Sequence, residues 1–191
     1  GNYLITNTTN AETTSSLNFW DNNVGSGFET SNSVNTSLIT WNWRRAPGFF
    51  DVVAYKGDGA TERAISHNLG VAPDMIWVKN RDVISDWRVN LFNALGSTTG
   101  ALLQENWAGF NDASSWGSYY PDESIFKVAG ISDFNHASYS YVAYLFGTVA
   151  GVSKGGSYTG NGSSQTINCG FSSGARFILI KRTDSTGDWY L

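Results

Sequence analysis

The 191-residue chain has few charged residues, a single cysteine and no long apolar run. Charged side chains make up 15% of it, against roughly 25% in an average soluble domain, so uncharged polar groups must form much of its surface. With 12 Lys and Arg against 16 Asp and Glu, it lacks the basic excess of proteins that bind nucleic acid through counterion release. No stretch approaches the about 18 consecutive apolar residues of a membrane-spanning helix. The composition therefore predicts neither a nucleic-acid partner nor membrane insertion.

The one cysteine, Cys169, excludes an intrachain disulfide. We expect it to be a small buried apolar residue, because free cysteine is among the most buried residue types. A catalytic thiol would need a histidine partner, and neither His67 nor His136 lies near it in the sequence. The lack of cross-links fits a chain made in a reducing cytosol, or one whose stability never relied on disulfides.

Aromatic and small polar residues are abundant instead. The 8 Trp, 9 Tyr and 11 Phe supply the apolar mass that a disordered chain lacks. Alternating apolar residues predict strands at 38–43 and 139–146, and short apolar runs predict central strands, buried on both faces, at 75–79 and 176–181. Helical spacing is weak and confined to 91–95. Together these features predict an all-β fold. Turn signals rich in Gly, Asn and Ser separate the strands at 56–59, 68–70, 160–162, 172–174 and 185–188.

The clearest signal in the sequence is an internal repeat. Apolar and turn residues recur after 102 or 103 positions, which fits one deleted residue in the second copy. More weakly, Leu4 and Ile5 match Leu102 and Leu103, and Trp20 matches Trp116. The strongest matches pair 39–43 with 142–146, 55–59 with 158–162, and 75–89 with 177–191.

The repeat predicts two tandem copies of an antiparallel β-sandwich with a jelly-roll-like arrangement. The first copy spans 1–100, with a part A at about 1–43, a part B at 44–90 and a connector at 91–100. The second spans 101–191, with A′ at 101–146 and B′ at 147–191, and is expected to be truncated. Residues 1–3 carry no signal-peptide features and 188–191 fall inside an expected strand, so we expect a segment of a longer protein.

No residue is predicted to be catalytic, to bind a cofactor or to hold a metal. Asp82 and Asp86, with their counterparts Asp184 and Asp188, flank a hairpin turn, where Asp commonly bonds nearby backbone amides. A Ca²⁺ site is an alternative, but one loop offers too few carboxylates for it. A glycosidase pair is a weaker alternative, since it needs two carboxylates facing a cleft. We expect His67 to pack in a turn, and His136 is similarly isolated.

Eight tryptophans are the other candidates for a site. Some of those on expected strands have Tyr, Phe or Leu in the other copy, which favours packing in the core or between repeats. Trp20, Trp107 and Trp116 lie in polar, glycine-containing stretches instead. Tryptophan suits surfaces that are half apolar and half wet, so these three are candidates for stacking on a glycan or for contacting another subunit.

Part of the sequence resembles a repeat domain of uncharacterised function found in large structural, tail-fibre-like virion proteins of tailed bacteriophages that infect marine bacteria. The likeness covers most of 39–90 and 142–191, whereas 1–38 and 91–141 match poorly. It implies a virion location, tandem repetition and an extracellular working environment, and it supplies no catalytic residues. The resemblance rests on residues 46–53, 55–59, 67–73 and 77–79 in the first copy, and on 149–154, 156–162 and 177–190 in the second.

These observations favour a non-enzymatic virion protein, a tail fibre, spike or capsid-decorating component, over two other hypotheses. The expected partners are copies of the chain, since symmetric homo-oligomers are the usual way for such surfaces to stack, and other virion proteins. The first alternative is a carbohydrate-binding adhesin module that recognises host surface polysaccharide through the exposed tryptophans. The second is a polysaccharide-degrading spike enzyme, which would need an acidic cleft that the sequence does not reveal.

Overall fold

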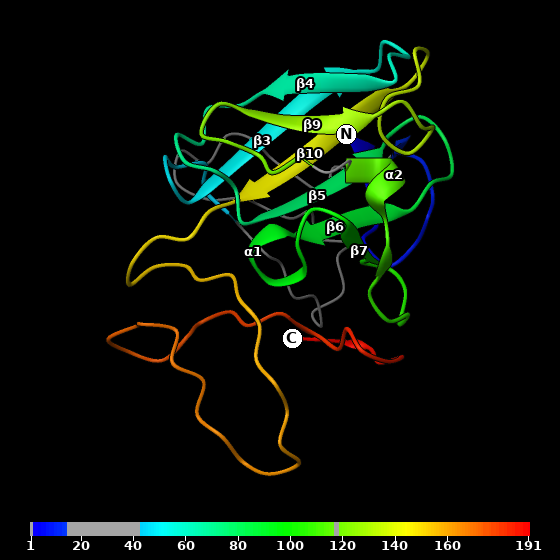
Figure 1. Cartoon of the computed structure of the whole chain (residues 1–191). Helices are drawn as coiled ribbons and strands as arrows, with labels where there is room; N and C mark the ends of the chain where they lie inside the picture. The colour runs from blue at the N-terminus through cyan, green and yellow to red at the C-terminus, as the bar shows by residue number, and fades with distance from the viewer. Residues whose placement is uncertain (1, 15–42, 117–118) are drawn as a thin grey trace, which may run out of the picture.

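The computed structural model describes residues 2–14, 43–116 and 119–191. Its largest element is a six-stranded antiparallel sheet with the strand order β3-β10-β5-β6-β7-β8, drawn in Figure 1. The strands are β3 (Phe50–Lys56), β5 (Met75–Asn80), β6 (Trp87–Leu91), β7 (Thr99–Leu102), β8 (Phe110–Asn111) and β10 (Ser140–Phe146).

Three two-stranded antiparallel pairs and two short helices complete the described structure. This content confirms the predicted all-β class with antiparallel sheets. The described part of the chain holds no helix with the length and apolar character of a membrane span. The pairs are β1 (Asn2–Tyr3) with β2 (Thr13–Thr14), β4 (Glu62–Ser66) with β9 (Ile125–Ala129), and β11 (Ile180–Lys181) with β12 (Trp189–Tyr190); the helices are α1 (Phe92–Leu95) and α2 (Ala113–Trp116).

The main core lies between the sheet and the β4–β9 pair, which crosses one face of it (Figure 1). Alternate residues of β10 point into this core because side chains of a strand alternate between its two faces. Tyr141 anchors the layer, since its hydroxyl donates to the carbonyl oxygen of Ser132 at 2.7 Å and its ring stacks on Tyr55. The buried members of the cluster include Ile65, Ile76, Val78, Phe126, Val128, Phe134, Ala143 and Leu145.

A second apolar cluster covers the opposite face of the same sheet. Trp77, Val89 and Ala101 form its buried centre, and Trp43 and Trp189 are among the partly buried residues packed against it. β5 is therefore covered from both sides, and five of its six residues are buried. This confirms the prediction of a central strand at 75–79.

Strand β10 connects the two predicted halves of the chain. It lies between β3 and β5 and pairs with both of them, with Tyr144 opposite Val52 on one side and Trp77 on the other. The expected boundary between residues 100 and 101 therefore falls inside one sheet, whose strands come from parts B and A′. The division into two tandem sandwiches stays a prediction from the sequence repeat.

The segment 147–191 has a different character and runs outside the sheet, as the orange and red trace in Figure 1 shows. The predicted strand at 176–181 is wrong for its first four residues, and only Ile180–Lys181 is a strand. Phe177 and Ile178 are exposed, so the expectation of a strand buried on both faces is wrong here. Cys169 is half-buried, not fully buried as expected. The reason is that β11 pairs with β12 alone among the described strands.

Candidate interaction surface

The hairpin β1–β2 has the same register as the hairpin β7–β8. Asn2 pairs with Thr14 as Thr99 pairs with Asn111. Tyr3 pairs with Thr13 as Gly100 pairs with Phe110. The corresponding residue numbers differ by 97 throughout. The start of part A and the start of part A′ therefore form the same local structure.

The β11–β12 pair likewise reproduces the far end of the β5–β6 pair. Lys181 lies opposite Trp189 as Lys79 lies opposite Trp87, so the corresponding residue numbers differ by 102. The apolar runs and turns of parts B and B′ thus fold alike at their tips, although they differ along the remaining length.

Three hydrogen bonds between an A hairpin and a B tip occur in both copies, in addition to the Arg81–Glu12 ion pair of the first contact and the bond from the Lys181 ammonium to the carbonyl oxygen of Asn106 in the second. In the first contact, the backbone amide of Glu12 donates to the carbonyl oxygen of Arg81 at 2.7 Å, and that of Ser85 donates to Thr9 at 2.9 Å. The indole Nε1 of Trp87 donates to the carbonyl oxygen of Ile5 at 3.0 Å.

The second contact repeats these bonds. The amide of Gly109 donates to the carbonyl oxygen of Thr183 at 3.0 Å, and that of Gly187 donates to Asn106 at 2.8 Å. The indole Nε1 of Trp189 donates to the carbonyl oxygen of Leu102 at 2.9 Å. All six residues are those expected from shifts of 97 in the A parts and 102 in the B parts, so one docking geometry occurs twice in the chain.

This geometry corrects the weak sequence match at the start of the repeat. The sequence alignment paired Leu4 with Leu102, whereas the structure pairs Leu4 with Ala101 and Ile5 with Leu102. The signal was hard to find because backbone groups make most of the contact, and backbone groups leave little trace in a sequence. The two tryptophans are the exception, since each supplies the one side-chain donor among the three repeated bonds of its contact.

Beside the first contact lies a buried ionic cluster around Arg88. Its guanidinium donates two hydrogen bonds to one oxygen of Asp133, Oδ2, at 2.6 Å from Nη2 and 2.9 Å from Nε, and Nη1 lies 3.5 Å from Asp112. The hydroxyl of Ser85 donates to Asp133 at 2.7 Å. Burial raises the pKa of Asp112, and the nearby Ser115 hydroxyl and Arg88 oppose that rise. The cluster holds three distant segments together, although the second carboxylate oxygen of Asp112 is buried without a hydrogen-bond partner among the described residues.

Lys79 is buried in the same region, at the end of β5. Its ammonium donates to the carbonyl oxygen of Asn80 at 2.6 Å. Burial lowers the pKa of Lys79 to about 8, and the carboxylates of Asp133 and Asp86 partly offset this. Its counterpart Lys181 donates to the carbonyl oxygen of Gly187 at 2.6 Å, and burial lowers its pKa as well.

The candidate acidic residues Asp82 and Asp86 bond to other segments, so the expectation that they bond amides of their own turn is not confirmed; Asn80 accepts the amides of Asp82 and Val83 instead. Asp82 accepts the backbone amide of Ser140 at 2.6 Å, and Asp86 accepts the side-chain amide of Gln104 at 2.9 Å. Asp184 forms an exposed ion pair with Arg182. Within the described ranges, no group of three or more His, Cys, Asp or Glu side chains is arranged to hold a metal ion.

The histidines take part in turns. His67 is buried, and its Nδ1 accepts the backbone amide of Leu69 at 3.2 Å, as expected for a histidine packed in a turn. His136 accepts the amide of Ser138 at 3.3 Å in the same manner. A shallow open hollow lies next to His67, where residues 70–72 face 121–124.

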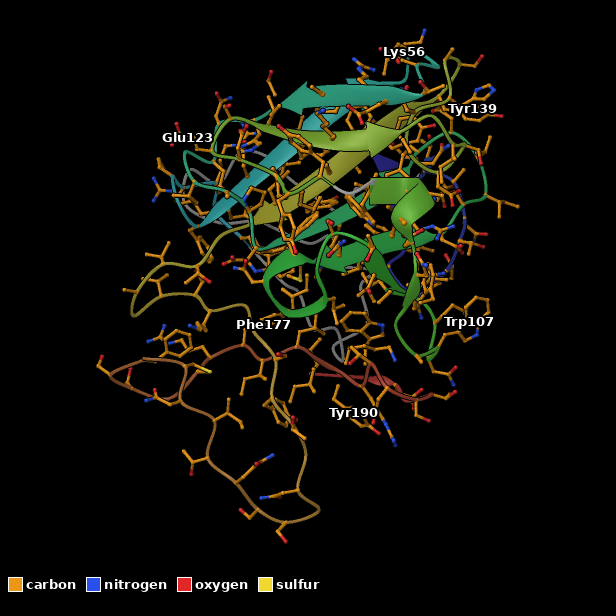
Figure 2. The ribbon with its side chains drawn as sticks, in the orientation of Figure 1. Lys56, Trp107, Glu123, Tyr139, Phe177 and Tyr190 are labelled. Carbon is orange, nitrogen blue, oxygen red and sulfur yellow. The ribbon has the colours of Figure 1, made fainter. Side chains whose placement is uncertain are left out.

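The three candidate tryptophans have different environments. Trp107 is 58% exposed and points away from the sheet at the rim of the molecule, as Figure 2 shows. Trp116 is only 2% exposed, because α2 places its ring edge-on to Phe92 and Phe134 in the main core. The expectation of a glycan or subunit contact at Trp116 is therefore corrected, since a buried ring offers no face for stacking. Trp20 lies outside the described residues.

The most exposed apolar surface is on segment 147–191. Several of its side chains match buried residues of part B: Ile178 is 55% exposed and its counterpart Ile76 is 0% exposed, while Leu191 is 63% exposed and Val89 is 2% exposed. Large exposed apolar groups of this kind mark surfaces that contact another molecule. The other exposed apolar residues of the segment are Val152, Tyr158, Ile167, Phe177, Ile180 and Tyr190.

The fold and this surface define an antiparallel β protein that carries one hairpin-to-tip contact twice and an exposed apolar segment at its C-terminal side. The family described as a domain of unknown function (DUF7483) matches residues 1–191, and the chain belongs to that family. No curated protein matches the chain, and no solved structure does.

Proposed function

We propose that the chain is a non-enzymatic structural component of a bacteriophage virion, such as a tail fibre, spike or capsid-decorating protein, which assembles with copies of itself and with other virion proteins. The observation that carries this proposal is the contact made twice between A hairpins and B tips, with the same three hydrogen bonds. Units that dock on one another through a repeated contact are typical of arrays and spacers.

The composition supports the same function. Few charged residues and many small polar ones suit β-surfaces that pack against other proteins, because desolvating a charge costs more than desolvating a hydroxyl or an amide. The virion setting comes from the sequence resemblance to tail-fibre-like proteins. The exposed apolar side chains of 147–191 supply a surface that an assembly would cover.

The test is detection of the chain in purified phage particles. We expect peptides from residues 1–191 in the mass spectrum of gradient-purified particles, and particle labelling by antibodies raised against the purified chain. A lysate fraction depleted of particles serves as the control. Peptides found only in that fraction would contradict the proposal.

A second function, binding of a host surface polysaccharide, is favoured by one observation, the exposed ring of Trp107. In titrations with host polysaccharide, we expect a change in tryptophan fluorescence that Trp107→Ala abolishes and that Tyr158→Ala, which removes another exposed aromatic ring, retains. Reducing ends released during the titration would instead indicate a polysaccharide-degrading enzyme. Unchanged fluorescence would leave the structural function without a glycan-binding role.

A further inference from the structure

We propose that two copies of this chain join head to tail by strand pairing, with β12 of one copy beside residues 2–5 of the next. The proposal deepens the proposed function and rests on it in one respect, the assembly of a structural component with copies of itself. The geometry comes from a pairing already present within the chain, between β6 and β7.

The template is the antiparallel pairing of β6 with β7. Arg88 lies opposite Leu102 and Val89 opposite Ala101, and the amide of Leu103 donates to the carbonyl oxygen of Trp87 at 3.1 Å. This pairing joins a B tip to the A hairpin that follows it in the chain. It buries Val89, Ala101 and Leu102.

The chain contains a second strand like β6 and a second strand like β7, but these two do not pair with each other. β12 is the counterpart of β6, and residues 2–5 are the counterpart of β7, but each belongs to a two-stranded sheet among the described residues. Tyr190 and Leu191 are exposed on one side, and Ile5 is exposed on the other. Their counterparts in the β6–β7 pairing are mostly buried, so each of the two strands fits a neighbour with the sequence character of the other strand.

The two strands lie at opposite ends of one row of contacts within the chain. β1–β2 docks on the β5–β6 tip, β6 pairs with β7, and the β7–β8 side docks on the β11–β12 tip. Figure 1 shows the blue N-terminal hairpin and the red C-terminal pair well apart. The partner in this proposal is a second copy of residues 1–191, since one copy cannot bring both ends of its own row together while keeping the contacts between them.

The register of the pairing follows from the template. Tyr190 lies opposite Ile5 of the next copy and Leu191 opposite its Leu4, and the amide of Thr6 donates to the carbonyl oxygen of Trp189. Such a contact is heterologous, so it generates rings where the rotation closes and filaments where it does not. Low charge at both edges favours the pairing, since lysines are a common device against edge-to-edge contact.

Disulfide trapping tests the register directly. One chain carries Cys169→Ser and Ile5→Cys, the other Cys169→Ser and Tyr190→Cys, and the two are mixed under mild oxidation. Residues opposite each other in antiparallel strands have Cα atoms about 4.5 to 5.5 Å apart, within disulfide range. We expect the mixture to form covalent dimers about tenfold faster than a control mixture in which Val152→Cys replaces Tyr190→Cys, because docking raises the local thiol concentration. Val152 is a matched control at 61% exposed, against 64% for Tyr190.

Three outcomes would overturn the proposal. One is a dimer yield no higher than in the Val152→Cys control. Another is efficient dimerisation of the Tyr190→Cys chain alone, which would show symmetric β12–β12 pairing. The third is an intrachain disulfide in a dilute chain carrying both cysteines, which would show pairing within one copy.

A second pair of variants tests association by sedimentation, with no disulfide formation. We expect Leu191→Asp to abolish the concentration-dependent increase in sedimentation coefficient, and Val152→Asp to retain it, because an unpaired carboxylate at the junction must be desolvated. Both side chains are exposed, so the melting temperature of the monomer should not change. Trapped dimers without peptides in particles would contradict the virion function alone, and particle-bound chains without trapped dimers would contradict this inference alone.

Discussion

Residues 75–79 and 177–181 have closely matching sequences and very different environments. Ile76 is fully buried in β5, between two neighbouring strands and two apolar clusters, whereas Ile178 is exposed in a segment that lies outside the sheet. Both segments have the apolar run of a central strand, but only the first has β10 beside it. The difference shows that an apolar run becomes a buried strand only when another segment covers it and satisfies its backbone groups.

Parts B and B′ fold alike at their tips and differ along the rest of their length. The tips fold alike because a hairpin and its docking partner lie on the same chain, as the matched bonds of Trp87 and Trp189 show. The remaining length folds only in part B, where β9 and β10 complete the layers. Turn formation and hairpin docking thus occur in both copies, whereas pairing along the full strands occurs in part B alone among the described residues.

The largest expected effect comes from the two tryptophans of the repeated contact. Trp87 is buried, and its ring packs near Tyr144. We expect Trp87→Ala to lower the free energy of unfolding by about 3 to 5 kcal/mol. Trp189→Ala should cost about 1 to 2 kcal/mol, because Trp189 is half-buried and loses less contact area. Urea unfolding of the two variants measures both values. Equal losses of unfolding free energy would contradict the prediction that the first contact is more deeply buried than the second.

The two isoleucines test the apolar runs themselves. Ile76→Ala should lower the free energy of unfolding by about 2 to 4 kcal/mol, because it opens a cavity in the main core. Ile178→Ala should change it by less than about 0.5 kcal/mol, as usual for an exposed side chain. Thermal unfolding followed by circular dichroism distinguishes them. A large loss from Ile178→Ala would mean that segment 147–191 is covered in solution.

Ion pairs provide a third comparison. Asp133→Asn removes a carboxylate that Arg88 holds with two hydrogen bonds in a largely buried cluster, and we expect a loss of about 2 kcal/mol. Asp184→Asn breaks the exposed pair with Arg182 and should cost less than about 0.5 kcal/mol. Denaturant midpoints at low and high salt give the values. High salt should reduce the loss of unfolding free energy only for Asp184→Asn, because salt screens exposed ion pairs much more than buried ones.

A fourth comparison is the pH dependence of stability that Lys79 contributes. Burial lowers the pKa of Lys79 from 10.5 to about 8 in the folded chain, so the unfolded state binds more protons between these values. This lysine therefore contributes stability that rises with pH across that window. Lys79→Met should remove the rise, whereas Lys181→Met should alter the profile less, because Lys181 lies in the exposed segment.

Urea unfolding of the natural chain and both variants between about pH 8 and 10 measures this effect. Comparison at each pH is essential, because burial raises the pKa of Tyr144 and of Tyr141, which makes the folded chain lose stability once unfolded tyrosines ionise. Profiles of the natural chain and Lys79→Met that stay parallel would contradict the assignment.

Much of the fold could be predicted from residue patterns. Alternation predicted the strand at 139–146, and the apolar run predicted β5, because period-two spacing and short apolar runs reflect one or two buried faces. The turn at 68–70 was predicted for the same kind of local reason, since Gly70 has a φ of +78° that favours glycine. His67 followed from its position in that turn.

The candidate surface was harder to predict. Trp116 looked exposed because its sequence neighbours are polar, yet a four-residue helix turns its ring into the core. The repeated docking contact consists mainly of backbone hydrogen bonds, which almost any sequence can make. Trp107 is the one candidate that the structure places on the surface.

The sequence by itself determined the β class, the positions of the central turns and the correspondence between parts B and B′, because these depend on local periodicity and on residues suited to tight turns. Only the tertiary structure decided which copy of an apolar run is buried, where β10 inserts and which strands of the described residues pair on one side only. Those outcomes depend on contacts between segments far apart in the chain, and two segments with similar sequences experience different neighbours.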